Sequence, residues 1–197
     1  MVLLPDSFHA FAYQSGVDSI RDAFQASITT LREAERKAGA EYLNYMQSGE
    51  DDDEYDEDGC LTHSTLHSLA HAEIQVGYAA REVRKAFITS AFHYWERSAR
   101  SWTGMFEPKH GFDVLLEASA EKHPISPDLV MLNHLNNVLK HHSIRSAPKL
   151  ADIRTDHFYR PPYRDTPDGP LMWTMRINTG HVEEAIEIVR ASGPQVS

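Results

Sequence analysis

Two long stretches of the chain carry apolar side chains at the three- and four-residue spacing of an amphipathic helix, and this repeat constrains the fold more than any other feature. The first stretch runs from Val17 to Gln47, behind a capping box formed by Ser15 and Asp18. The second runs from Thr62 to Trp102 and is weakest at Gly77, because glycine is a poor helix former. We therefore expect two long antiparallel helices, the second either continuous or divided into two stacked helices.

A shorter stretch, Ser126 to Ser143, gives the least ambiguous helical signal. Ser126 can cap a helix with its hydroxyl, and Pro127 suits the first helical position. An apolar stripe follows at Met131, Leu132, Leu135, Val138 and Leu139. The opposite arc is polar and consists of Asn133, Asn136, Asn137, Lys140 and His141. Asparagine is a poor helix former, so helix propensity does not explain this arc. It is either a solvated face, or a few core-edge amides bonded to a neighbouring helix, or a polar site built from amides, an ammonium group and an imidazole.

Weaker patterns complete the prediction of an all-α fold, a helical bundle of four to six helices. Short helices are expected at Phe112–Glu121 and Ser146–Arg154, and a final helix ends near Ala191. Residues 1–14 are predicted to be an irregular arm packed on the body. We expect a single domain that spans residues 1–197.

The C-terminal part, residues 155–197, is expected to wrap the body as a loop, an extended segment and the final helix. Residues 155–170 are rich in turn-forming residues and include a turn at Pro167–Pro170. Leu171–Ile177 is strand-like by residue type, but no other segment offers an evident partner. We therefore expect this strand to pair with another chain or to remain an extended segment.

Negative charge is concentrated in the first third of the chain. The formal net charge is -10, but residues 1–59 hold 14 Asp and Glu against 4 Lys and Arg, whereas residues 60–197 hold 15 of each kind. A global acidic field opposes non-specific phosphate binding. Any contact with nucleic acid must therefore be local or be supplied by a partner.

The most acidic segment, residues 49–59, carries eight carboxylates around Tyr55 and is flanked by glycines. Like-charge repulsion and the scarcity of apolar residues predict a solvated loop. Carboxylates can also bind calcium or a basic partner, but the ligand order of a calcium-binding loop is absent from this segment.

Cysteine content and hydropathy predict a cytoplasmic protein. Cys60 is the single cysteine, which excludes an intrachain disulfide and fits a reducing compartment. The N-terminal segment has neither a basic region nor a long apolar region, and no run approaches the roughly 18 apolar residues that a membrane span requires. We expect no membrane contact and no cofactor.

Two groups of polar residues fall within the second long stretch. His63, His67 and His71 step by four, a spacing at which two histidines can bind a divalent ion, but a metal site needs three or four convergent ligands. They are therefore weak metal candidates, and surface or core-edge histidines are the alternative. Further along, Thr89, His93, Glu96 and Arg100 form a polar stripe that fits a row of intrahelical ion pairs.

Two segments resemble the HEPN family, all-helical domains named for nucleotide-binding proteins of higher eukaryotes and prokaryotes. ITSAFHYWE, from Ile88 to Glu96, resembles the second-helix pattern of an aromatic-rich core that ends in an acidic residue. LNNVLKHH, from Leu135 to His142, is similar to the later-helix pattern R-N-x-x-K-H. The resemblance covers residues 60–160. It implies a dimer with polar helices facing each other across a cleft, in toxin, phage-defence or RNA-processing systems, and active members cut RNA without a metal ion.

The resemblance also implies roles for individual residues. His141 would be the general base or acid at a ribose 2′-hydroxyl, because imidazole titrates near neutral pH. Asn137 and Lys140 would match interior positions of the motif, and Lys140 could steady a phosphate oxygen. Glu96 would be the supporting acid on the partner helix. The departure is Asn136, because active members carry arginine there, and losing such an electrostatic donor costs roughly a hundred- to a thousandfold in rate.

These observations leave three functional hypotheses. The missing arginine favours a non-catalytic HEPN-like association module, acting as a homodimer or as a subunit of a bacterial defence or toxin-antitoxin complex. The alternative within the same fold is a metal-independent endoribonuclease that uses His141. The third is an unrelated helical protein that binds a metal ion or a small ligand.

Overall fold

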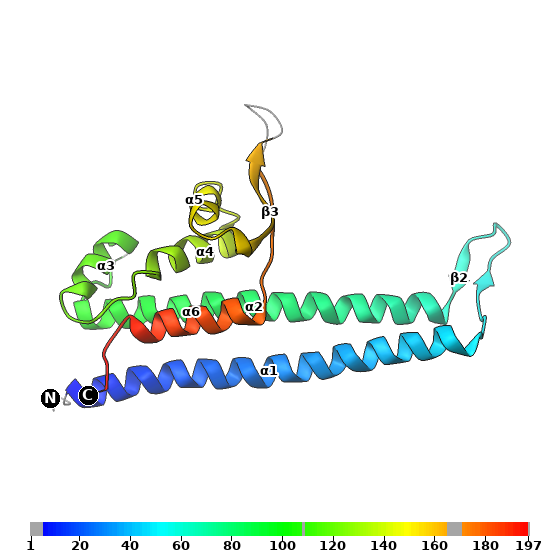
Figure 1. Cartoon of the computed structure of the whole chain (residues 1–197), viewed down its shortest axis with the longest axis horizontal. Coiled ribbons are helices and arrows are strands. Elements are labelled where there is room, and N and C mark those ends of the chain that lie inside the picture. The colour runs from blue at the N-terminus through cyan, green and yellow to red at the C-terminus, as the bar shows by residue number, and fades with distance from the viewer. Residues whose placement is uncertain (1–5, 108, 165–170, 197) are drawn as a thin grey trace. The chain divides into compact units, whose positions relative to one another are not determined.

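The computed structural model describes residues 6–107, 109–164 and 171–196, and helix predominates in them (Figure 1). The helices are α1 (Asp6–Ser48), α2 (Thr65–Thr103), α3 (Phe112–Ala120), α4 (Leu129–His141), α5 (Ser146–Ile153) and α6 (Thr179–Ala191), with a 3-10 turn at Thr155–His157. Strands β1 (Glu54–Tyr55) and β2 (Leu61–His63) pair antiparallel, as do β3 (Phe158–Arg164) and β4 (Leu171–Met175). The prediction of a mostly helical bundle is confirmed.

Backbone contacts divide the chain into two compact units. The first comprises the described residues of Met1–Phe24 and Arg84–Ser197, and the second comprises Gln25–Val83. Helices α1 and α2 each contribute residues to both units. We refer to them below as the core unit and the hairpin unit.

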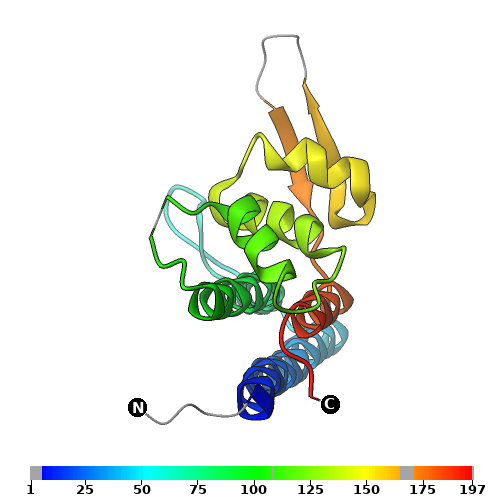
Figure 2. The ribbon, with the colours of Figure 1, turned by 90° about the vertical axis from the view of Figure 1, so that its left-hand side faces the viewer.

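In the core unit, α3 and α4 lie on one side of the C-terminal part of α2, and α6 lies beside α1 and α4 (Figures 1 and 2). Trp95, at the centre of the aromatic segment of α2, is completely buried. Its ring packs on Phe112 of α3 with 5.8 Å between ring centroids. Leu132 and Leu135 of α4 and Ile186 of α6 are also buried. The aromatic segment of α2 therefore packs in the core together with α3, α4 and α6.

Helices α1 and α2 run antiparallel within the core unit. Tyr13 stacks on Tyr94, with ring centroids 5.5 Å apart, and Phe24 packs on Phe87, with ring centroids 5.3 Å apart, so residue numbers rise along α1 as they fall along α2. Gly77 lies inside α2, and this helix is continuous.

Helix α1 begins eleven residues before the predicted start at Val17, at Asp6. Ser15 and Asp18 therefore lie inside the helix, and the capping-box prediction is wrong, as is the irregular arm for residues 6–14. Tertiary contacts explain the earlier start of α1. Ala10 and Tyr13 continue the helical spacing and are buried, and the Tyr13 hydroxyl donates a hydrogen bond to the Val189 carbonyl of α6 (2.6 Å). Residues 1–5 of the predicted arm lie outside the described residues.

Helix α4 starts at Leu129, so the predicted cap at Ser126 is also wrong. The Ser126 hydroxyl accepts the backbone N–H of Asp128 (3.3 Å), which precedes the helix, and Asp128 occupies the capping position without a side-chain hydrogen bond. The backbone N–H of Ser126 donates to the Ser192 hydroxyl after α6 (3.0 Å). The helix ends at His141. The next residue, His142, has a left-handed backbone (φ 48°), and its N–H donates to the Val138 carbonyl (3.0 Å).

The C-terminal strand has its partner within the chain. Strand β4 pairs with β3, a segment that the sequence predicts to be a loop, so both the unpartnered strand and the loop at 158–164 are corrected. The register shifts between Arg160 and Tyr163, where the two prolines of β3 supply no N–H. The predicted turn at Pro167–Pro170 lies outside the described residues. Helices α3, α5 and α6 occupy their predicted places, and Asn178 caps α6 through a capping box with His181.

In the hairpin unit, the acidic segment is exposed as predicted but contains β1, so it is partly a β-hairpin with β2. Asp52 anchors this segment to both helices: it accepts hydrogen bonds from the Tyr45 hydroxyl (2.6 Å) and the Thr65 backbone N–H (3.1 Å). The Thr65 hydroxyl also donates to the Asp52 carboxylate. The bonds from the Thr65 hydroxyl, first, and from the Tyr45 hydroxyl hold the pKa of Asp52 well below its ordinary value. Helix α2 accordingly begins at Thr65 rather than Thr62.

No helix in the described parts of the chain is long and apolar enough to cross a membrane.

Candidate functional site

All five residues proposed from the sequence for a polar site line one recess of the core unit. The recess has a volume of about 280 Å³ and lies among α2, α3 and α4. Helix α4 contributes half of the lining residues, with Asn133, Asn136, Asn137, Lys140 and His141. Helix α2 contributes Phe92, His93 and Glu96, and α3 contributes Phe112 and Leu115. We call it the α2–α4 recess.

The amides of α4 form the inner part of this wall. Asn137 donates a hydrogen bond to the Asn133 amide oxygen (3.2 Å). Asn136 is only 3% exposed, and its buried amide oxygen has no hydrogen-bond partner among the described residues. Because a buried polar atom without a partner is costly, a solvated face does not describe Asn136, and its oxygen is available to a donor that enters the recess.

On the facing wall, three side chains of α2 form a chain of polar contacts. His93 Nδ1 lies 3.1 Å from one carboxylate oxygen of Glu96, and the guanidinium of Arg100 donates to the other (2.9 Å). Arg100 also donates to the carbonyls of Met105 (3.1 Å) and His110 (3.3 Å), in the loop that follows α2. The predicted row of intrahelical ion pairs is therefore present, and the loop carbonyls hold Arg100 in place.

These contacts set the charges at the mouth of the recess. Partial burial alone would raise the pKa of the Glu96 carboxyl, but hydrogen bonds from Arg100 and His93 lower it, so Glu96 is ionised. Lys140 Nζ lies 3.4 Å from His93 Nε2. An ammonium group can only donate, so His93 Nε2 accepts and the imidazole proton sits on Nδ1, facing Glu96.

The recess therefore combines groups suited to acid–base chemistry on an anionic ligand. His93 is an imidazole oriented by a carboxylate, which is the arrangement that prepares a histidine to accept a proton at its other ring nitrogen. Lys140 supplies a positive charge next to it, and His141 adds a second imidazole on an exposed part of α4. Such a set can move two protons and neutralise a phosphate oxygen.

Sequence reasoning did not include His93 and Arg100 among the site residues. Both belong to the polar stripe of α2, and their spacing from Glu96 by three and four residues was the available signal. The stripe alone could not show which helix it faces. That information comes from the contact between Lys140 and His93.

The weak metal candidates do not converge. His63 lies in β2, outside α2, so the three histidines do not share one helical face. His63 Nε2 lies 3.4 Å from a carboxylate oxygen of Asp52, and His71 lies 3.3 Å from the Gln75 amide. Across residues 6–107, 109–164 and 171–196, no group of three or more His, Cys, Asp or Glu side chains is placed to hold a metal ion.

Comparison of the chain with protein-family models, with curated proteins and with solved structures found no match.

Proposed function

We propose that this protein is a HEPN-like helical domain whose α2–α4 recess binds a phosphodiester of RNA and cleaves it without a metal ion. The observation that carries the proposal is the contact between Lys140 and His93, which brings a cation of α4 to an imidazole of α2 already oriented by Glu96. His141 lines the same recess.

The proposed reaction uses the three groups in turn. Lys140 leaves His93 Nε2 and binds a non-bridging oxygen of the phosphate, which frees Nε2 to take the proton of the ribose 2′-hydroxyl. The 2′-oxygen attacks phosphorus, the bond to the 5′-oxygen breaks, and His141 in its protonated form gives that oxygen a proton. The products are a 2′,3′-cyclic phosphate and a 5′-hydroxyl end.

The charge of the core unit is compatible with such a substrate. Its sequence holds 16 Asp and Glu against 15 Lys and Arg, whereas the hairpin unit holds 13 against 4. Most of the net negative charge therefore belongs to the hairpin unit, and the recess has a cation at its mouth. Local phosphate binding then does not have to overcome a strongly acidic surrounding surface.

The identity of residue 136 determines how fast we expect cleavage of RNA to be. It stands where the resemblance implies an arginine, and Arg100 is occupied by Glu96 and by loop carbonyls. Lys140 is therefore the main positive charge for the transition state, and we expect cleavage to be slower by roughly a hundred- to a thousandfold than with a second permanent cation.

The test is cleavage of a labelled RNA oligonucleotide in EDTA, with the ends of the fragments identified. We expect cyclic phosphate ends with wild type, loss of cleavage with H93A and H141A, and a strong reduction with K140Q. H67A is the matched control, because His67 is an exposed histidine of α2 in the hairpin unit. The same oligonucleotide with 2′-deoxyribose must stay intact. Cleavage that persists in H93A and H141A would refute the assignment.

A non-catalytic association module is the second candidate, and the buried Asn136 favours it. An asparagine in the place of the motif arginine supplies no charge, so the recess could hold a ligand or a partner group without reacting. Wild type that binds the RNA but leaves it intact would select this function. The resemblance further implies a dimer, and light scattering at micromolar concentration tests that expectation independently of RNA.

A further inference from the structure

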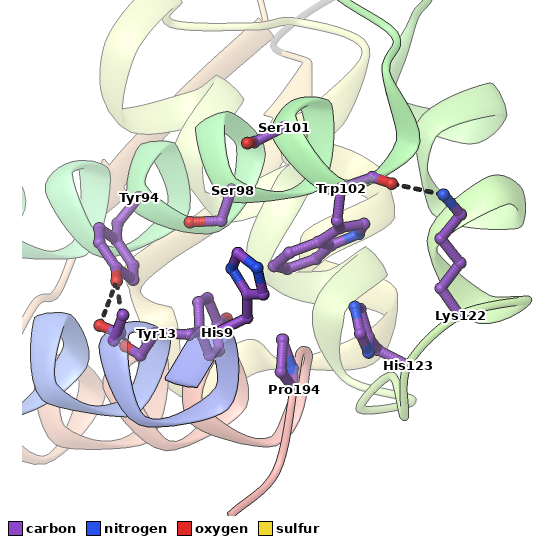
Figure 3. A pocket seen from close by; sticks show the side chains of 10 residues that line it. His9, Tyr13, Tyr94, Ser98, Ser101, Trp102, Lys122, His123 and Pro194 are labelled. Carbon is purple, nitrogen blue, oxygen red and sulfur yellow. Dashed lines mark hydrogen bonds between the residues drawn. The ribbon is translucent and has the colours of Figure 1, made fainter. Parts of the chain in front are cut away.

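A second cavity of the core unit lies on another side of α2 and shares no lining residue with the α2–α4 recess. Its volume is about 600 Å³, and its walls come from α1, the end of α2, the segment after α3 and the chain after α6 (Figure 3). The cavity is large enough for a small organic ligand. We call it the aromatic pocket.

Three aromatic side chains give this pocket a preformed wall. Tyr13 is 4% exposed, and its ring stacks on Tyr94 and meets Trp102 edge-on, with 5.5 Å between ring centroids in both pairs. The Tyr94 hydroxyl donates to the Tyr13 carbonyl (3.0 Å), and the Trp102 indole N–H donates to the Ser119 hydroxyl (3.3 Å). The rings of Tyr94 and Trp102 are each attached to α2 at one end and hydrogen-bonded at the polar end, so they keep their positions when a flat ligand enters.

Glycines allow these rings to approach the backbone. A Cβ atom at Gly16 would lie 2.0 Å from the Tyr94 hydroxyl oxygen, and one at Gly193 would lie 2.5 Å from the Tyr13 ring. Both distances are far below any contact that carbon atoms accept. The aromatic wall therefore depends on glycine at two positions distant in the sequence.

The other wall of the pocket is polar and carries positive charge. Lys122 donates to the Trp102 carbonyl, and the His123 ring packs edge-on against the Trp102 indole with centroids 4.9 Å apart. From α1, the His9 ring reaches toward α2 beside Trp102 (Figure 3). None of the described lining residues is acidic.

The polar wall continues into a neighbouring hollow of about 300 Å³. The two cavities share His9, Lys122, His123 and Pro194, and the second adds the hydroxyl of Ser7 and the amide of Gln195. One end of the combined groove is thus aromatic, and the other presents an ammonium group and two imidazoles. A ligand that fits both ends has a flat apolar part and an anionic part.

We infer that the aromatic pocket binds a small molecule in which a planar aromatic ring carries an anionic group, a carboxylate or a phosphate. The ring lies against Trp102 and the two tyrosines, and the anion lies at Lys122 between His9 and His123. Stacking on aromatic faces and charge-assisted hydrogen bonds supply the affinity. This inference rests on groups that the proposed RNA site does not use.

Isothermal titration calorimetry on the full chain tests the inference with five probes. Indole-3-acetate and adenosine 5′-monophosphate carry both features, indole-3-acetamide and adenosine lack the anion, and acetate lacks the ring. We expect saturable binding of at least one of the first two, with its uncharged counterpart weaker by about tenfold, the usual value of one charge-assisted hydrogen bond. Acetate should not saturate. Binding of indole-3-acetate would identify the ligand as an aromatic acid, and binding of adenosine 5′-monophosphate would identify it as a nucleotide.

Two variants locate the binding. K122Q removes the charge of an exposed side chain and should weaken the anionic probe by about tenfold, without changing the neutral one. S98L fills the cavity beside Tyr94 and should abolish both. K109Q is the control for a lysine outside the pocket and should bind like wild type. Absence of saturable binding by either anionic probe, or binding unchanged in K122Q and S98L, would overturn the inference. No RNA is present, so the result is separate from that of the cleavage assay.

Discussion

Substituting Gly16 with alanine tests the packing of α1 on α2, because helix propensity and tertiary contact predict opposite signs. Gly16 lies in the interior of α1, where glycine costs about 1 kcal/mol relative to alanine. Propensity alone therefore predicts that G16A stabilises the protein. The new methyl group, however, would lie 2.0 Å from the Tyr94 hydroxyl oxygen and 2.5 Å from the adjacent ring carbon, so Tyr94 has to move.

The displacement of Tyr94 removes two interactions. One is its hydrogen bond to the Tyr13 carbonyl, worth about 1 kcal/mol. The other is its stack on Tyr13, worth about 1 kcal/mol beyond the buried area. Against a gain of about 1 kcal/mol from propensity, the net effect of G16A is a destabilisation of about 1 kcal/mol. G77A is the matched control, because a Cβ atom there meets nothing within 4 Å inside α2, and it should stabilise by about 0.5–1 kcal/mol.

Urea unfolding followed by tryptophan fluorescence and by circular dichroism measures both variants. Trp95 and Trp102 lie in the core unit with Gly16, so fluorescence reports that unit, and circular dichroism also reports the hairpin unit that contains Gly77. In a Y94A background the obstruction is gone, and G16A should then stabilise by about 1 kcal/mol. If G16A stabilises the wild type as much as G77A does, the described approach of Tyr94 to α1 is wrong.

Two further predictions concern titratable groups. His157 is 1% exposed, and burial, followed by the neighbouring His181, lowers its pKa to about 4. The unfolded chain binds this proton more readily, so the free energy of unfolding falls by about 3 kcal/mol in total as the pH drops from about 6.5 to about 4. Unfolding of H157F across this range should lack this loss of stability, and an unchanged pH profile would contradict the prediction. In the hairpin unit, D52A should speed amide hydrogen exchange in the first turn of α2, since Asp52 accepts the backbone N–H of Thr65 and alanine cannot. D53A is the control and should leave this exchange unchanged.

Local patterns were sufficient for most helices. Helices α3, α5 and α6 fall where the sequence predicts them, because the local patterns that indicate a helix act within one or two turns. The polar arc of α4 could also be identified in advance, since residues three and four apart share a helical face whatever surrounds them. Of the five residues to which the resemblance assigns a position in the motif, Asn136, Asn137, Lys140 and His141 come from this arc, and Glu96 comes from α2.

Helix ends were less predictable from the sequence. Ser15 and Ser126 both have the chemistry of a capping residue, yet neither caps a helix. In the first case, burial of Tyr13 against α6 extends α1 past Ser15. In the second, α4 starts only at Leu129, so the N–H that the Ser126 hydroxyl accepts, that of Asp128, precedes the helix. Tertiary contacts help to set where a helix starts, and the sequence does not reveal those contacts.

By itself, the sequence determined the helical character of the chain, the exposed acidic segment and the polar face of α4, because periodicity and charge repulsion are properties of neighbouring residues. Only the tertiary structure decided that β4 pairs with β3, that His93 faces Lys140, and that residues of α1, α2 and the C-terminal segment enclose an aromatic pocket. Each of these joins segments far apart in the chain. Their registers depend on how whole helices and strands pack, and that packing is not encoded in any single local pattern.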